Sequence, residues 1–400
     1  MRALAFCVLV AAGLAEAGGA RAQDIGAAIA AGKPILQERI RYENVDQGNF
    51  GRDAEALTLR SRFGWETGAW NHLTGLIEGE ATSHLGAEHF NDGLNHQTLY
   101  PGIGDPETLE LHRLQLTWAP SKAFTAVIGR QKINIDDQRF IASSTWRQDE
   151  QAFDAIRLDS TVGRFSGTYF YINRYDRNVA HAADYRSNSH GLTVTYAAAP
   201  ALKVEGFIYA VDLKESPTGS TLTEGVRITG QQALPAFKLA YAASYASQRN
   251  YAANPASYDL PYWMGEVSAS RGPYLVKANY DSLGSDGRHG VSTPLGSVHL
   301  YQGWADAFTT TPARGINDFN LSATYSPSFR WGSLSAPQFF LRHHDFSYAS
   351  GTGGLGTEWD AYAQIGLTKQ LTGLIKYADY HGTAAVPGRR KLWLQLDFNL

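Results

Sequence analysis

Apolar and polar residues alternate along most of the chain, in segments of about ten residues that recur up to the C-terminus. Because side chains with a period of two lie on opposite faces of an extended strand, each segment predicts a strand with one apolar and one polar face. The clearest alternations lie at residues 57–66, 113–118, 238–245, 319–325, 359–368 and 392–398. A tilted strand of roughly 9–11 residues is long enough to cross a bilayer.

The connections between these strands alternate in length. Short ones lie at residues 119–122, around Pro200 and Pro235, and at 271–273 and 369–370. Long polar ones lie at residues 83–106, 134–150, 174–189, 282–316 and 381–390. Outer-membrane barrels have short periplasmic turns, longer extracellular loops and an even number of strands. We therefore expect an all-β fold, a transmembrane antiparallel β-barrel of about 18 strands, in which the connection at 326–337 is long for a periplasmic turn.

A soluble β-sandwich or propeller is the alternative to this barrel. Such a protein buries the apolar faces of its strands and joins them by tight turns of similar length. Two features favour a membrane barrel instead. The long connections all lie at one end of the strands, and aromatic residues stand at strand ends, at Trp65, Trp118, Tyr325 and Trp359. The mean hydropathy of −0.29 is compatible with a barrel, because half of each strand faces water.

The N-terminus has the features of a secretory signal peptide. Arg2 precedes an apolar run at residues 3–14, and Ala20-Arg21-Ala22 fits the pattern that signal peptidase cleaves. We expect a signal peptide at residues 1–22, a short helical or flexible leader at 23–33, and an outer-membrane barrel at 34–400. Cys7 is the only cysteine, so the mature chain is expected to contain no disulfide bond. No later apolar stretch has the length of a membrane helix.

Basic residues recur on the polar face of neighbouring early strands. A charged side chain at the lipid face costs about 2–4 kcal/mol at the bilayer midplane, so we expect these residues to face the lumen. They are Arg39, Arg41, Arg60, Arg62, Arg113, Arg130, Lys132 and Arg157. Carboxylates stand among them, at Glu38, Glu43, Glu66, Glu78, Glu80, Asp154 and Asp159.

Two interpretations of this basic face remain open. In the first, arginines and carboxylates pair into a ladder that braces the barrel wall and narrows its pore. In the second, the arginines form an anion-selective path, because a guanidinium binds carboxylates in a bidentate manner and a low-dielectric wall focuses its field. The two are compatible, since a selective pore needs both positive charges and the groups that hold them.

Four short motifs follow one another between residues 129 and 157: Gly129-Arg130-Gln131, Asp136-Asp137-Gln138-Arg139-Phe140, Trp146-Arg147-Gln148, and Gln151 with Phe153-Asp154. In their order and spacing they resemble the alginate-export family of outer-membrane proteins. Ile141-Ala142 stands where glycine is common in that pattern. The last strand ends Phe398-Asn399-Leu400, whereas the terminal strand read by barrel assembly machinery usually ends on an aromatic residue.

The resemblance implies a passive channel in the outer membrane of a Gram-negative bacterium that exports an anionic, alginate-like polysaccharide made of uronic acids. The simplest interpretation of the motif from Asp136-Asp137 through Gln151 is a loop that folds into the barrel and constricts it. Its candidate residues are Asp136, Asp137, Arg139, Trp146, Arg147 and Gln151. Expected partners are the anionic oligo- or polysaccharide, outer-membrane lipid and lipopolysaccharide, the barrel assembly machinery and periplasmic export proteins. No nucleic acid is expected from a net charge of −3.

Other functions fit the same fold. A general or oligosaccharide-uptake porin has the opposite direction of flow, and a structural barrel or adhesin has a sealed pore. A barrel enzyme such as a lipase could use His343 or His344 as a base, but period two puts His343 and Asp345 on one face and His344 on the other. His181, Asp184 and His190 are more simply loop residues than a cation site. We therefore expect no catalytic residue, no metal and no cofactor.

Overall fold

The computed structural model describes residues 24–179, 184–199 and 201–400. The predicted signal peptide and His181 lie outside the described residues. Within these ranges, no helix is long and apolar enough to cross a membrane.

Almost all of the described chain is β-strand. The strands are β1 (Lys33–Gln47), β2 (Ala54–Glu66), β3 (Leu73–His84), β4 (Thr108–Ser121), β5 (Phe124–Gln131), β6 (Ala152–Val162), β7 (Phe165–Asp176), β8 (Tyr185–Ala199), β9 (Leu202–Val211), β10 (Thr221–Ala233), β11 (Lys238–Asn250), β12 (Asp259–Arg271), β13 (Tyr274–Leu283), β14 (Ile316–Tyr325), β15 (Arg330–Trp331), β16 (Leu334–Ser347), β17 (Gly354–Gly366), β18 (Leu371–His381) and β19 (Arg389–Asn399). The helices are α2 (Ile25–Ala30) and the 3₁₀ turns η3 (Pro217–Gly219) and η4 (Val298–Leu300).

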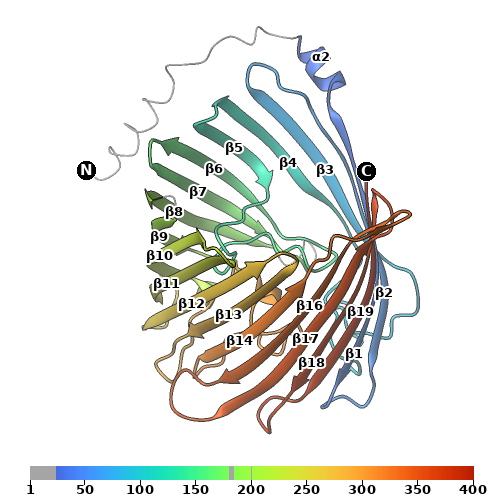
Figure 1. The fold of residues 1–400 in the computed structure, drawn as a ribbon, viewed down its shortest axis with the longest axis vertical. Coiled ribbons are helices and arrows are strands. Elements are labelled where there is room, and N and C mark those ends of the chain that lie inside the picture. Colours follow the sequence, from blue (N-terminus) through green and yellow to red (C-terminus); the bar gives the residue numbers. More distant parts are fainter. Residues whose placement is uncertain (1–23, 180–183, 200) are drawn as a thin grey trace.

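The strands form one closed antiparallel barrel. Each long strand pairs with its neighbours along the chain, and β19 pairs with β1 to close the ring (Figure 1). The two-residue β15 pairs only with β16, while β14 pairs directly with β16, so 18 strands make up the wall. This confirms the predicted strand number. The small β15–β16 hairpin also accounts for the length of the predicted 326–337 connection.

The barrel is apolar outside and polar inside, the reverse of a soluble protein. On β4, for example, Leu114, Leu116 and Trp118 are exposed, whereas Gln115 and Thr117 between them are partly covered. Buried charged side chains line the interior, among them Arg41, Glu43, Arg60, Arg62, Glu78 and Glu80. Only a lipid environment makes such an outer surface favourable, because each apolar side chain exposed to water loses about 25 cal/mol per Å² of stabilisation.

The connections at the two ends differ as the sequence predicts. At one end they are short, for example residues 122–123, 163–164 and 272–273. At the other end, three connections are long, at residues 85–107, 132–151 and 284–315. The leader is helical at α2, which docks at the short-turn end, where Trp65 Nε1 donates to Ile29 O (2.9 Å) and the Gly68 amide donates to Ala28 O (2.8 Å).

Candidate functional site

The β5–β6 loop (residues 132–151) crosses the lumen and contacts opposite walls of the barrel. On one side, Gln148 Nε2 donates to Thr58 Oγ1 of β2 (2.8 Å). On the other side, Arg139 Nη2 donates to Asp281 Oδ1 of β13 (2.7 Å). Figure 1 shows the chain leaving the tip of β5 and turning inside the ring of strands. All six residues of the predicted constriction lie in this loop, which occupies part of the lumen.

The β13–β14 loop (residues 284–315) also enters the lumen and packs on the β5–β6 loop. Ile141 and Leu295 form an isolated parallel bridge, in which the Ala142 amide donates to Leu295 O (2.8 Å). Tyr301 Oη donates to Asp137 O (2.6 Å). Ile141 and Leu295 are buried and belong to an apolar cluster that the two loops share with the barrel wall. The two loops therefore form one internal body rather than two independent flaps.

Arg139 holds this internal body to β13. Its guanidinium contacts Asp281, donates from Nη1 to Gln302 Oε1 (3.0 Å), and lies over the Tyr301 ring at 4.3 Å. Arg139 and Asp281 are almost fully buried, with 2% and 1% of their side chains exposed. In this setting each charge depends on the other for solvation.

The tip of the β5–β6 loop carries a carboxyl group that responds to pH. Burial and the neighbouring Glu205 raise the pKa of Asp136 to about 8, against a smaller opposite effect of Arg227. Asp137 beside it pairs with Arg227, and Tyr209 packs nearby. Because the folded-state pKa is raised above the ordinary value, the stabilisation of this contact is complete below pH ~4 and is lost as the pH rises through about 8.

We expect this titration to appear as a pH dependence of loop position. Above pH 8, Asp136 is ionised in a buried position beside the Glu205 side chain, so the loop tip should separate more often from β9. Brief opening events in single-channel recordings should become more frequent between pH 7 and pH 9. Asp136→Asn keeps the neutral form at every pH and should abolish the dependence. An unchanged pH profile in Asp136→Asn would show that another group is responsible.

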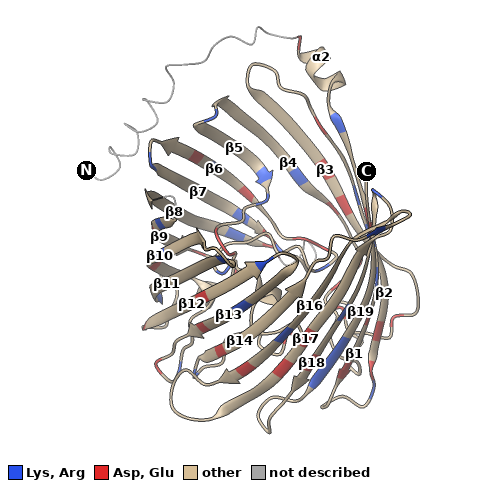
Figure 2. Ribbon diagram, in the orientation of Figure 1, with Lys and Arg blue, Asp and Glu red and all other residues tan. Residues whose placement is uncertain are grey.

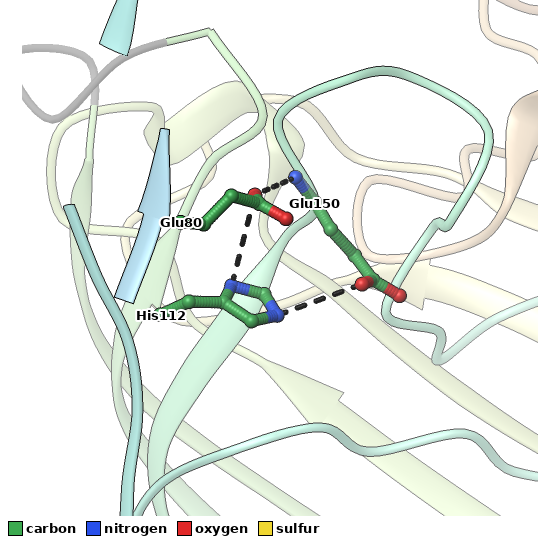
Figure 3. A group of neighbouring side chains, drawn as sticks. All are labelled: Glu80, His112 and Glu150. Atoms are coloured by element: carbon green, nitrogen blue, oxygen red, sulfur yellow. Dashed lines mark hydrogen bonds and ion pairs between the residues drawn. The ribbon is translucent and has the colours of Figure 1, made fainter. Parts of the chain in front are cut away.

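The other end of the same loop is fixed by Glu150. Its carboxylate pairs with Arg62 and with Lys132 Nζ (2.6 Å), and its amide donates to Glu80 Oε1 (2.9 Å). His112 lies between the two carboxylates, with Nε2 at 3.5 Å from Glu150 and Nδ1 at 4.0 Å from Glu80 (Figure 3). Glu80 also pairs with Arg62.

Glu80, His112 and Glu150 are the one group of potential metal ligands within the described ranges. Arg62 and Lys132 already neutralise the two carboxylates at contact distance. A divalent cation added here would be buried next to two further cations, which is electrostatically unfavourable. We interpret the group as a charge network that anchors the loop.

Trp146 joins the loop to the barrel wall through stacked cations. The Arg41 guanidinium lies 4.1 Å from its ring centroid, and Lys376 Nζ lies 3.6 Å away. Lys376 is also 3.8 Å from the Trp304 ring and 2.7 Å from His299 Nε2. Cation–π contacts strengthen when they are desolvated, to about 2 kcal/mol or more. Trp146 therefore connects β1, β18 and the β13–β14 loop.

The predicted basic face divides into two parts. Arg62 and Arg113 belong to a paired ladder, in which Arg62 contacts Glu80 and Arg113 Nη2 lies 2.6 Å from Glu78 Oε2. Figure 2 shows acidic positions on β3 beside a basic position on β4. Arg157 likewise pairs with Asp159 at 2.9 Å. This part matches the interpretation of a braced wall.

The second part, Arg39, Arg41 and Arg60, carries more positive than negative charge. Arg39 pairs with Asp397 at 2.8 Å. Among the described residues, the one carboxylate at ion-pair distance from Arg41 is that of Asp105, at 4.0 Å. Arg60 is 4% exposed, has no carboxylate within ion-pair distance in the described chain, and has two nitrogens without a hydrogen-bond partner. We call these three side chains the arginine cluster. It lies under the β5–β6 loop, since Arg39 Nη1 donates to Thr145 O (3.2 Å).

One residue predicted to line the lumen, Arg130, lies on the outer face instead. Arg130 lies opposite Leu114 in the β4–β5 register, and antiparallel partners share one face of the sheet. Because Leu114 is on the apolar outer surface, Arg130 faces outward, where it pairs with Asp154 (2.7 Å) and Asp176 (2.8 Å). Lys132 lies just beyond the end of β5, and its ammonium group faces the interior, where it pairs with Glu150.

The sequence interpretation overlooked the wall on the other side of β1, which β16 to β19 form. The basic side chains that face the inward loops there, together with carboxylates of β17, are Arg342, Lys376, Arg389 and Lys391. Asp360 and Glu358 accept the backbone amides of Trp304 (3.3 Å) and Ala305 (2.7 Å). The same period-two argument identifies several of them, because Arg342 stands between Leu341 and His343, and Lys376 between Ile375 and Tyr377.

The histidines do not form a hydrolase site. His344 points inward between Asp318 (2.7 Å) and Asp360 (3.4 Å), whereas the ring of His343 packs at a tilt against the outward Trp359, with the centroids 4.6 Å apart. Both ring nitrogens of His344 therefore face carboxylates. Asp184 pairs with Arg174 at 2.8 Å, and His190 packs against Tyr171.

Solved structures with this fold are outer-membrane proteins. OpdO of Pseudomonas aeruginosa superposes with a TM-score of 0.72 at 14% identity, covering 94% of this chain and 99% of that one. OccAB2 of Acinetobacter baumannii gives 0.71 at 15% identity, with coverage of 94% and 99%. P. aeruginosa OpdK with vanillate gives 0.68 at 12%, with coverage of 92% and 98%. No curated protein sequence matches the chain.

The family model described as alginate export matches residues 36–254, more than half of the chain. The match contains the arginine cluster and the whole β5–β6 loop. Together with the 18-strand barrel, it places the protein in the Gram-negative outer membrane and points to a channel for solutes. The chain belongs to the alginate-export family of outer-membrane proteins.

Proposed function

We propose that the protein is a passive channel for anionic solutes and that uronate saccharides are the class of cargo it serves. The arginine cluster carries this proposal. A buried guanidinium without a carboxylate partner is costly, and in most proteins such a charge is paired or solvated. The β5–β6 loop covers Arg60, but its uncompensated charge in a low-dielectric wall gives the adjoining lumen a positive potential that favours anions.

Guanidinium groups suit carboxylate cargo. Each presents a planar fork of donors that fits both carboxylate oxygens, and it remains charged at every physiological pH. Arg60 leaves Nε and Nη1 without acceptors, and Arg41 leaves Nη1 and Nη2 without acceptors. Transport along such groups needs neither bond chemistry nor a cofactor. Export of an alginate-like polymer is the form that the family name suggests.

Uptake of smaller anionic solutes is the second candidate. The two inward loops fill part of the lumen with an apolar cluster, which leaves less room for a polymer than an open barrel does. The similarity to OccAB2 and OpdK concerns the fold alone. Assembly machinery and lipopolysaccharide remain expected partners of either form, and periplasmic export proteins remain expected partners of the export form.

Ion selectivity tests the shared part of the proposal. The purified full-length barrel in planar bilayers under a KCl gradient should give a reversal potential that indicates preference for chloride. Replacing Arg41 and Arg60 together by Gln should reduce the anion-to-cation permeability ratio several-fold, because the field at a low-dielectric wall scales with its unpaired charges.

Arg249→Gln is the matched control. Arg249 forms an exposed pair with Glu224 on β10 and β11, far from the lumen cluster in sequence. It should leave the reversal potential unchanged. Cation selectivity of the wild-type channel, or no conductance at all, would refute the proposal and favour a structural barrel.

A further inference from the structure

A cavity of about 620 Å³ opens at the long-loop, extracellular end of the barrel. It lies among the β3–β4, β5–β6, β7–β8 and β13–β14 loops and the start of β19. Four cationic side chains line it, Arg147, Arg177, Arg389 and Lys391, against the single carboxylate of Asp306. Its volume is within the range of roughly 300–1,000 Å³ that small-molecule sites occupy.

The cations of this cavity differ in how far carboxylates neutralise them. Asp306 is shared by Lys391 Nζ (2.7 Å), His299 Nδ1 (2.8 Å) and Arg147 Nη2 (3.8 Å). Behind the cavity, Arg147 also pairs with Glu43 (3.0 Å) and Asp105 (3.5 Å), and Lys391 Nζ lies 3.9 Å from Glu43. Arg147 and Lys391 are therefore held in one network of ion pairs.

Arg389 is the cation that this network leaves without an acidic partner. Its Nη1 donates to Ala305 O (3.0 Å) and Asp306 O (2.7 Å), and within the described ranges no carboxylate lies at ion-pair distance. Its Nε is buried and has no hydrogen-bond partner. The two carbonyls fix the orientation of the guanidinium without neutralising it, which leaves its charge available to a ligand.

Two cavities near the short-turn, periplasmic end have no excess of basic side chains. One, of about 300 Å³ beside Lys122 and Arg157, is lined by Asp136, Asp159 and Glu205. The other, of about 410 Å³ beside Lys277, Arg342 and His344, is lined by Asp137, Glu266 and Asp318. Even with Asp136 neutral because of its raised pKa, each has at least as many carboxyl groups as basic side chains, so the inner mouth attracts an anion less than the outer one.

We propose that the outer cavity is an anion-binding site that captures small carboxylate-bearing solutes from outside the cell, such as uronates of one or two sugar rings. The assignment of uronate as the ligand rests on the proposed function. A positive cleft raises the local concentration and association rate of an anion by roughly 10–10³-fold. The site thus loads the channel from the extracellular side, which favours uptake over export of a polymer.

The test is one-sided block of single channels in planar bilayers. The probes are glucuronate and digalacturonate, with glucose and cellobiose as neutral counterparts, added to one chamber at a time. An antibody against an epitope inserted at the exposed Ala384, in the β18–β19 connection, identifies the extracellular side. The uronates should interrupt the current from the extracellular side at concentrations about tenfold lower than from the periplasmic side.

Variants of Arg389 assign the block to the cavity. Arg389→Gln should weaken the extracellular block about tenfold, the effect of losing one charge-assisted hydrogen bond. Arg389→Lys retains the charge and should recover part of it, which a merely structural role of the guanidinium would not predict. In the Arg249→Gln control, the uronates should block the current as strongly as they do in the wild-type channel.

Three outcomes would overturn this inference: equal block from both sides, stronger block from the periplasmic side, or unchanged block in Arg389→Gln. A wild-type channel that is anion-selective but shows any of these would refute the capture site and leave the proposed function intact. A cation-selective channel would refute the proposed function itself. Equal block by the neutral sugars would show that charge does not determine binding.

Discussion

Replacing Arg139 by Ala is expected to open the channel. The substitution removes the partner of the buried Asp281 carboxylate, the contact to Gln302 and the face-on contact to Tyr301. Breaking a buried ion pair from one side costs about 3–5 kcal/mol, because the remaining charge is left without compensation. The barrel wall keeps its own hydrogen bonds, so this cost falls on the attachment of the internal body. Single-channel conductance should rise several-fold.

Folding and local structure can be separated in this experiment. Retention of the heat-sensitive electrophoretic mobility of a folded barrel shows that the wall is intact. Arg249→Ala removes an exposed pair, for which a change of only about 0–1 kcal/mol is expected, and should leave conductance unaltered. A folded Arg139→Ala channel with wild-type conductance would show that the Arg139–Asp281 pair does not hold the loops in place.

The strands could be predicted because each carries its own signal. On β2, Leu57 and Leu59 alternate with Thr58 and Arg60, and a shift of one residue would move every charge to the lipid face. The free-energy cost of placing charges against lipid therefore determines which face of each strand is inward, and this can be read from the strand's own sequence. The positions of Arg39, Arg41, Arg60 and Arg62 follow from this rule alone.

The rule failed where alternation is weak. In β5, Ala126-Val127-Ile128 is a continuous apolar run, so the sequence does not show which parity faces lipid. The structure has Val127 and Gly129 on the inner face, and Arg130 therefore points outward. Its charge is tolerated because Asp154 and Asp176 pair with it near the end of the strand.

Contacts of the inward loops could not be derived from the sequence. Arg139 and Asp281 are 142 positions apart, and Tyr301 reaches Asp137 across 164. Loop backbones have no periodicity that would specify such pairs, and their geometry depends on the closed barrel around them. The family motif indicated that the β5–β6 loop matters, but its partners in the β13–β14 loop had no sequence signal. The orphan charge of Arg389 depends on the same packing.

Replacing Trp146 by Ala is expected to uncover the arginine cluster. The indole contacts the Arg41 guanidinium, Lys376 and His299, and its removal leaves a cavity whose cost for an aromatic core residue is about 3–5 kcal/mol. The segment around Thr145, which now covers Arg39, should detach from β1. Anions would then reach Arg60 more easily, so both conductance and the anion-to-cation permeability ratio should increase.

This result differs from that of Arg139→Ala in a way that tests the arrangement of the site. Loss of Arg139 detaches the internal body from β13 and should raise conductance with less change in selectivity, because Arg139 lies across the lumen from the cluster. Trp146→Phe keeps an aromatic face for both cations and should stay close to wild type. If Trp146→Ala raised conductance while the reversal potential stayed constant, the three arginines would not be what selects anions, and the charged outer cavity would be the better candidate.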